Sequence, residues 1–294
     1  MATQRESAGA GSPRSCLADL LRRISYEVTP FPNTERNVLE HVPVTVPLTV
    51  TVTKAKGIDA TLGLTERLVR HGYTVAPHLP ARQFRDRQHV ADVVARLREA
   101  RVRSVFVVGG DAPRPAGEFE DAYALLRAMR EAHHPFEEVG IAGYPEGHPV
   151  VSREALELAL KRKAPMATRV ITQICFHAGT TADWAAGIAA AGIGLPVHVG
   201  IPGPVNRHKL MRITANLGLG QSARFLRKHR SLLWRFLLPG AYQPARLARE
   251  LGLAVPRTGG NIRGLHIFTF DELSRTELWR RRLLESVSEK DDRS

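Results

Sequence analysis

The sequence predicts a single α/β domain, a (β/α)₈ barrel, and two observations lead to this fold class. Eight short apolar runs rich in Val and Ile recur along the 294 residues, and several are nearly continuous, as in strands buried on both faces. Segments with apolar residues at helical spacing separate these runs. Strand–helix alternation repeated eight times is typical of a parallel sheet closed into a barrel.

The expected elements follow one another along the chain. The eight expected strands are Ile24–Pro30, Val46–Lys54, Tyr73–Pro80, Ser104–Asp111, Val139–Pro145, Arg169–Phe176, Pro196–Gly203 and Gly264–Phe270. The expected helices between them are Ala60–His71, His89–Ala100, Phe119–Ala132, a helix that Ser152 caps and that runs to Lys163, and Thr181–Ala191.

Three further segments fall outside this alternation. The long gap between the seventh and eighth strands predicts a helical insertion, with helices at Lys209–Leu217, Ser222–Leu238 and Gln243–Leu251. Residues before Leu20 predict an extra N-terminal helix that covers the bottom of the barrel, and Thr276–Ser288 predicts the closing helix. We expect residues 1–15 to form a flexible leader and residues 16–294 to form one catalytic barrel domain.

Composition excludes several classes of protein. Hydrophobic residues make up 43% of the chain and charged residues 24%, as in an ordinary globular protein, and no apolar run approaches the roughly 18 residues of a membrane span. Met1–Ser15 lacks the apolar centre of a secretion signal. Two cysteines, Cys16 and Cys175, cannot build a disulfide framework or a four-cysteine zinc site. These features predict a cytoplasmic protein that does not bind membranes.

The formal net charge of +13 admits three explanations. It can reflect an arginine-rich composition on solvated helix faces, an anionic small molecule as ligand, or nucleic acid as partner. Basic residues are scattered along the chain, and no aromatic residues alternate with them as on a platform for single strands. We therefore expect no nucleic-acid partner, and a gel shift at moderate salt tests this.

In this fold the active site lies at the C-terminal ends of the strands. The first strand delivers Glu27 there, between the apolar residues Tyr26 and Val28. Burial raises the pKa of a carboxyl group, and a carboxylic acid that stays protonated near neutral pH can act as a general acid. The alternative is an ion pair with a barrel arginine such as Arg23 or Arg263.

Later strands deliver groups that suit a flat heterocycle. Asp111 follows Gly109 and Gly110, which let the backbone approach such a ligand closely, and its carboxylate can accept hydrogen bonds from an amino-heterocycle. The alternative for Asp111 is a turn or helix cap. Gln173 offers both a donor and an acceptor, although a core amide bonded within the protein is the simpler explanation.

Other polar residues at the expected strand ends are Thr53, His78 and Thr269, together with the rigid loop Tyr144–Pro149. In that loop Tyr144 and His148 can line a slot for a ring. His148 has no second histidine or cysteine at ligand spacing nearby, so we predict no metal site.

These residues lie in stretches that resemble the methylenetetrahydrofolate reductase family. The matching stretches occur in order on all eight expected strands and cover nearly the whole chain after the leader. They read SYEVTPF, VTVTK, PHL, GGDAP, AGYPEGHP, LKRK, ITQ, GIPGPV and GLHIFTF, and AGYPEGHP is the most specific of them.

The resemblance implies a (β/α)₈ barrel that reduces 5,10-methylenetetrahydrofolate to 5-methyltetrahydrofolate with NAD(P)H, through FAD in most members. It implies that Glu27 is the acid that protonates N10 of the folate and that Asp111 lies beside the pterin and the hydride carrier. Gln173 would read the pterin edge, and Thr269 is a further predicted substrate contact. The predicted cofactor contacts are Thr53, His78, Gly110, Tyr144, His148, Lys161, Lys163 and His208.

The sequence also departs from the family pattern. Val28-Thr29-Pro30 replaces the usual Phe-Phe-Pro run, and Lys54-Ala55-Lys56 replaces Tyr-Gly-Ala. Most departures fall where a flavin would lie, whereas the residues on the folate side are intact. The sequence therefore leaves two alternatives open. The protein is either an enzyme that uses FAD or a member of a flavin-free branch in which NAD(P)H transfers the hydride directly. A non-catalytic folate- or flavin-binding barrel that partners a methyltransferase, and a flavin barrel resembling proline dehydrogenase, are competing hypotheses.

Overall fold

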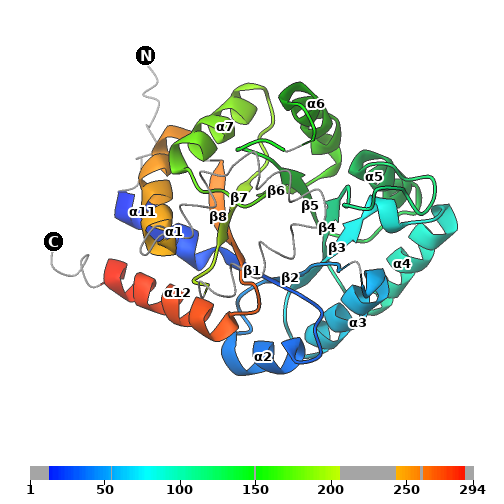
Figure 1. Ribbon diagram of the computed structural model, residues 1–294, viewed down its shortest axis with the longest axis horizontal. Helices are drawn as coiled ribbons and strands as arrows, with labels where there is room; N and C mark the ends of the chain where they lie inside the picture. Colours follow the sequence, from blue (N-terminus) through cyan, green and yellow to red (C-terminus); the bar gives the residue numbers. More distant parts are fainter. Residues whose placement is uncertain (1–12, 54, 149, 206–242, 259–260, 289–294) are drawn as a thin grey trace, which may run out of the picture.

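The computed structural model describes residues 13–53, 55–148, 150–205, 243–258 and 261–288. Eight parallel strands pair in chain order, and β1 pairs with β8, so the sheet closes into a barrel surrounded by helices (Figure 1). The strands are β1 (Ile24–Val28), β2 (Leu48–Val50), β3 (Val75–Pro80), β4 (Ser104–Val108), β5 (Glu138–Gly143), β6 (Arg169–Thr172), β7 (Val197–Pro202) and β8 (Ile262–Phe268).

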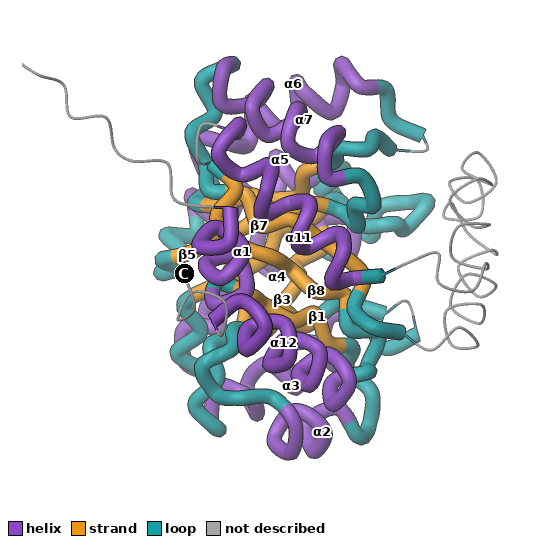
Figure 2. The backbone as a smooth tube through the Cα atoms, turned by 90° about the vertical axis from the view of Figure 1, so that its left-hand side faces the viewer, coloured by secondary structure: helices purple, strands orange, loops and turns teal. Residues whose placement is uncertain are grey.

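Helices follow the strands and cover the outside of the barrel (Figure 2). The α-helices are α1 (Pro13–Arg22), α2 (Thr34–His41), α3 (Gly57–Arg70), α4 (Arg87–Glu99), α5 (Ala122–Glu131), α6 (Arg153–Lys163), α7 (Ala178–Ala190), α11 (Pro244–Ala254) and α12 (Leu273–Ser288). Three 3₁₀ turns are η1 (Ala81–Gln83), η2 (Ala164–Met166) and η3 (Val255–Thr258).

The structure confirms the predicted (β/α)₈ barrel and all eight strands, although most strands are shorter than predicted. The second strand is the clearest case, because only Leu48–Val50 pairs and the chain then turns where Thr53 bridges to Gly57. The sequence did not predict helix α2, because only Thr34 and Val38 of its residues are buried. Two predicted insertion helices, Lys209–Leu217 and Ser222–Leu238, lie outside the described residues.

The predicted helix before the first strand is α1, which begins at Pro13. It packs against α11, α12 and β8, and its residues Leu17, Leu20 and Leu21 are buried in the core. Ser152 caps α6 as predicted, because its hydroxyl accepts a hydrogen bond from the backbone N–H of Ala155 (3.2 Å).

The alternation of side chains along β1 decides which residues face the inside of the barrel. Tyr26 points outward to the helices, where its hydroxyl donates a hydrogen bond to the carboxylate of Glu277 on α12 (2.8 Å). Arg280 and Arg281 also donate to Glu277. Because successive strand residues point to opposite faces, this outward anchor places Glu27 on the inner face.

Gly200 on β7 lies tightly against the neighbouring strands. A Cβ atom at Gly200 on β7 would lie 2.7 Å from the ring of Phe268 on β8. The same Cβ would overlap the backbone oxygen of Thr172 at the end of β6, so Gly200 has to lack a side chain.

Candidate active site

Glu27 lies one residue from the C-terminal end of β1, inside the barrel. Only 18% of its side chain is exposed, and burial raises the pKa of the carboxyl group above its ordinary value of 4.5, with His78 opposing the shift. No arginine among the described residues forms an ion pair with it. The ion pair with Arg23 or Arg263 that the sequence left open is therefore absent from the described part of the barrel.

Two imidazoles flank the Glu27 carboxyl instead. Its Oε2 lies 3.6 Å from Nε2 of His78 on β3 and 3.8 Å from Nε2 of His266 on β8. Burial lowers the pKa of His78 to about 4 and that of His266 to about 3, so both rings are uncharged at neutral pH. Neither contact is an ion pair under those conditions, and both distances are too long for a direct hydrogen bond.

Several buried polar atoms beside Glu27 have no hydrogen-bond partner in the described part of the chain. They are Nε2 of His78, Nε2 of His266 and Oγ1 of Thr49, whose residue pairs with Glu27 across β1 and β2. His266 is held by its other nitrogen, which lies 2.9 Å from the Ser25 hydroxyl. Buried polar groups are nearly always paired, so these atoms indicate a place for a polar ligand or water.

Thr269, the predicted substrate contact on the last strand, lies at the end of β8 and is fully buried. Its hydroxyl donates a hydrogen bond to the backbone carbonyl of Glu27 (2.6 Å) and accepts one from the N–H of Asp271 (3.3 Å). Thr269 therefore holds the ends of β1 and β8 together, and its contact with substrate stays a prediction.

The loop that carries Asp111 is held by one arginine. Arg82, in η1 after β3, donates hydrogen bonds to the backbone carbonyls of Ala112 (2.7 Å), Glu120 (3.0 Å) and Pro113 (3.1 Å). Its backbone also bonds to Gly109 and Ala116. These contacts fix the shape of the loop while leaving the Asp111 carboxylate exposed at the mouth.

Asp111 faces the rigid loop after β5. Tyr144 and His148 in that loop meet edge to face, with ring centres 5.3 Å apart. Burial and the charge of Asp111 raise the pKa of Tyr144, while burial lowers the pKa of His148 and Asp111 opposes that shift. Gly110 beside them has a positive φ of 89°, a conformation that L side chains rarely adopt. The structure thus brings Gly110, Asp111, Tyr144 and His148 together.

Gln173 lies just beyond the end of β6, exposed at the same mouth. Its side-chain oxygen accepts a hydrogen bond from the N–H of Ile174 (2.9 Å), which leaves its amide nitrogen available as a donor. Glu146 accepts from the N–H groups of Phe176 and His177 (2.6 and 2.8 Å) at the start of α7. This contact ties the loop of Tyr144 to the loop of Gln173.

The remaining predicted cofactor residues lie in other places. Thr53 is in the turn before α3, with its hydroxyl buried and unpartnered in the described structure. Lys161 is exposed on α6, whereas Lys163 is buried, which lowers its pKa to about 8 despite the charge of Asp121. His208 lies outside the described residues. The sequence did not point to Arg82 or His266, nor to the contact by which Glu146 holds the start of α7.

Comparison with known proteins shows which family the chain belongs to. A family model described as methylenetetrahydrofolate reductase matches residues 17–221, which is more than half of the chain. The chain belongs to the methylenetetrahydrofolate reductase family. It is therefore a member of an oxidoreductase family, and the matched region contains Glu27, Asp111 and Gln173.

Two relatives in this family show local similarity. A Caenorhabditis elegans protein named "Probable methylenetetrahydrofolate reductase (NADPH)" is 33% identical over 133 residues, which is 42% of this chain and 20% of that protein. Methylenetetrahydrofolate reductase 2 of Saccharomyces cerevisiae is 28% identical over 110 residues, which is 34% of this chain and 18% of that protein. The match thus spans about a fifth of the length of these curated relatives.

Solved structures support the fold alone. A 2,3-dimethylmalate lyase of the PEP mutase/isocitrate lyase superfamily superposes with a TM-score of 0.50 at 11% identity, covering 96% of this chain and 89% of that one.

Among the described helices, none combines the length and apolar character that a membrane crossing requires. The described residues also hold no group of three or more His, Cys, Asp or Glu side chains placed to bind a metal ion.

We expect the buried carboxyl of Glu27 to make the stability of the protein depend on pH. Its pKa is higher in the folded state, so the folded protein keeps a proton that the unfolded chain releases as pH rises above 4.5. Glu27→Gln should therefore match the wild type below pH 4.5 and become more stable than it as pH rises through the folded pKa. The gain should be about 1.4 kcal/mol for each unit by which the pKa is raised.

Urea unfolding from pH 4 to pH 8 measures this difference. Glu99→Gln, at an exposed position at the end of α4, is the matched control for the loss of one carboxyl group. A constant difference between Glu27→Gln and the wild type over this range would show that Glu27 does not carry a raised pKa.

Arg82→Gln should loosen the loop that carries Asp111. The glutamine is too short to reach the three carbonyls, and each lost hydrogen bond contributes about 0.5–1.5 kcal/mol, so the open form of the loop should become at least roughly tenfold more populated. Hydrogen–deuterium exchange of residues 110–120 measures this. Arg114→Gln, an exposed residue of the same loop, is the control, and equal exchange in both variants would contradict the role of Arg82.

Proposed function

We propose that this protein reduces 5,10-methylenetetrahydrofolate to 5-methyltetrahydrofolate with hydride from NAD(P)H. The observation that carries the proposal is the Glu27 carboxyl, which burial inside the barrel mouth keeps protonated at higher pH than an ordinary glutamic acid. A buried acid that keeps its proton is suited to general acid catalysis, because it can transfer that proton to a leaving nitrogen. Membership of the reductase family supports the same assignment.

The first step is proton transfer from Glu27 to N10 of the folate. The bond between N10 and the bridging carbon then breaks, and the electron pair goes to N10. A cationic iminium remains between that carbon and N5, and Glu27 becomes a carboxylate. His78 and His266 are uncharged on either side, so they do not hold Glu27 in its ionised form before the reaction.

Asp111 and Gln173 bind and orient the pterin in this proposal. The exposed Asp111 carboxylate can accept hydrogen bonds from the amino-heterocycle and stabilise the positive charge of the iminium. Preorganised electrostatic groups of this kind contribute about 2–4 kcal/mol in other enzymes. The amide nitrogen of Gln173 remains available as a donor, because the side-chain oxygen is engaged with Ile174.

The residues around Asp111 fit the flat ring of a hydride carrier. The edge-to-face pair of Tyr144 and His148 forms one wall, and Gly110, without a side chain, lets a ring approach the backbone. Lys161 is exposed and can meet a cofactor phosphate, whereas Lys163 is covered. NAD(P)H held there, directly or through FAD, would supply the hydride that the iminium carbon accepts.

We expect Glu27→Gln to lower kcat by about 10²–10⁴-fold, because the amide cannot donate the proton to N10. The Kd for the folate should stay within threefold of the wild type, since the glutamine fills the same space. Steady-state kinetics and equilibrium binding measure the two quantities, with Glu99→Gln as the control. A kcat within threefold of the wild type would refute the role of Glu27 as the acid.

An absorption spectrum of the purified protein separates the two cofactor routes. Direct transfer predicts a colourless protein that oxidises NADH or NADPH when the methylene folate is added. Transfer through FAD predicts flavin absorption bands and loss of turnover when the flavin is removed. A colourless protein whose activity appears only after FAD is added would contradict direct transfer.

A further inference from the structure

The barrel interior holds a buried polar pair, Ser25 and His266, to which the proposed mechanism gives no part in the chemistry. Ser25 lies on β1, and its hydroxyl is 2.9 Å from Nδ1 of His266 on β8. Strand pairing places the two residues directly beside one another, and both are buried. Bulky apolar residues usually fill the interior of such a barrel, so a polar pair at this depth calls for a reason.

The pair directs a hydrogen-bond donor at Glu27. A neutral imidazole carries its proton on one nitrogen and accepts a hydrogen bond on the other. When the Ser25 hydroxyl donates to Nδ1, the ring proton of His266 lies on Nε2. That nitrogen is 3.8 Å from Oε2 of Glu27 and has no hydrogen-bond partner among the described residues. Ser25 therefore selects the form of His266 that can donate to the carboxyl group.

Proton transfer from Glu27 leaves a negative charge where little water reaches it, and an unpaired buried carboxylate is costly. In the described part of the chain, no arginine or lysine forms an ion pair with Glu27. The titratable side chains that face its carboxyl group are His78 on β3 and His266 on β8. Arg169 on β6 and His198 on β7 interact with His266 instead.

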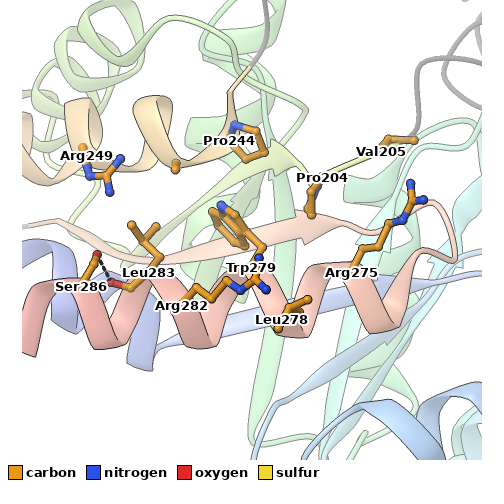
Figure 3. Close-up of a pocket in the computed structure, with 11 residues that line it drawn as sticks. Pro204, Val205, Pro244, Arg249, Arg275, Leu278, Trp279, Arg282, Leu283 and Ser286 are labelled. Carbon is orange, nitrogen blue, oxygen red and sulfur yellow. Dashed lines mark hydrogen bonds between the residues drawn. The ribbon is translucent and has the colours of Figure 1, made fainter. Parts of the chain in front are cut away.

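The arginines of α11 and α12 do not supply the missing charge. Arg249, Arg275 and Arg282 line a cavity between these two helices, which cover the outside of the barrel (Figure 3). None of the three is within ion-pair distance of Glu27 in the described structure. Uncharged donors inside the barrel therefore have to stabilise the carboxylate.

We propose that His266, held by Ser25, donates a hydrogen bond from Nε2 to the Glu27 carboxylate that forms during the reaction. The inference rests on the proposed function, because that reaction is what removes the proton from Glu27. The present separation belongs to the neutral acid, and a charge-assisted hydrogen bond would be about 1 Å shorter. Such contacts often tighten only when substrate is bound. Thr49, beside Glu27 on β2, has a buried hydroxyl that is also unpartnered in the described structure and can donate in the same way.

Titration of Glu27 in the protein without folate tests this positioning role. Infrared spectroscopy follows the carbonyl band of the protonated acid, assigned by its loss in Glu27→Gln. In the double variant Ser25→Ala/His266→Phe, the pKa of Glu27 should rise by about one unit, because the ionised form loses its donor. His266→Gln keeps an N–H donor and should stay within about half a unit of the wild type.

Ser25→Ala alone leaves the His266 proton free to occupy either nitrogen. It should raise the pKa of Glu27 by less than the double variant does, and it tests the pair if the double variant does not fold. Ser104→Ala is the matched control, because Ser104 is another buried serine of the barrel and donates to Glu138 (2.8 Å) instead. This control should leave the pKa of Glu27 unchanged.

Steady-state kinetics give a second readout. With Glu27 as the acid, kcat falls as pH rises through its pKa. The double variant should move this fall to higher pH and lower the plateau about tenfold, whereas Ser104→Ala should do neither. A substitution that merely loosened the barrel would admit water and lower the pKa toward 4.5, the opposite direction.

An unchanged or lowered pKa of Glu27 in the folded variants that lack the donor would overturn the proposal, as would an equal rise in Ser104→Ala. A raised pKa with an unchanged plateau of kcat would also overturn it, since the contact would then contribute nothing to the reaction. Absence of turnover in the wild type would contradict the proposed function, and the infrared titration would then decide the contact alone.

Discussion

The candidate site depends on the exclusion of water from one carboxyl group. Glu27 sits on the inner face of β1, and the closed sheet leaves only a small part of its side chain exposed. In a medium that solvates charge poorly, the neutral form of an acid and the neutral form of a base are both favoured. The same surroundings therefore account for the raised pKa of Glu27 and the lowered pKa values of His78 and His266.

Around this buried acid, three side chains hold the loops and strand ends of the mouth in place through hydrogen bonds to backbone groups. Arg82 holds the loop of Asp111, Glu146 holds the start of α7, and Thr269 joins the ends of β1 and β8. Each of them leaves a neighbouring functional side chain exposed or directed into the mouth. Rigid support of this kind keeps reactive groups in place without occupying them.

The sequence was sufficient to predict the barrel and the inward position of Glu27. Eight apolar runs specify eight buried strands, and the apolar residues on either side of Glu27 specify its face. The sequence could not show that His78 and His266 flank it, because that depends on the register of β3 and on the pairing of β1 with β8. Arg82 escaped notice because its partners are backbone carbonyls, which every residue has.

The side chains of the loop that carries Asp111 can change over evolutionary time. Since Arg82 recognises main-chain oxygens, the identities of Ala112, Pro113 and Glu120 matter little to the contact, provided that the backbone keeps its path. Substitutions can therefore alter these side chains while the backbone that carries Asp111 keeps its path. The shape of the loop is therefore less sensitive to substitution than the side chains along it.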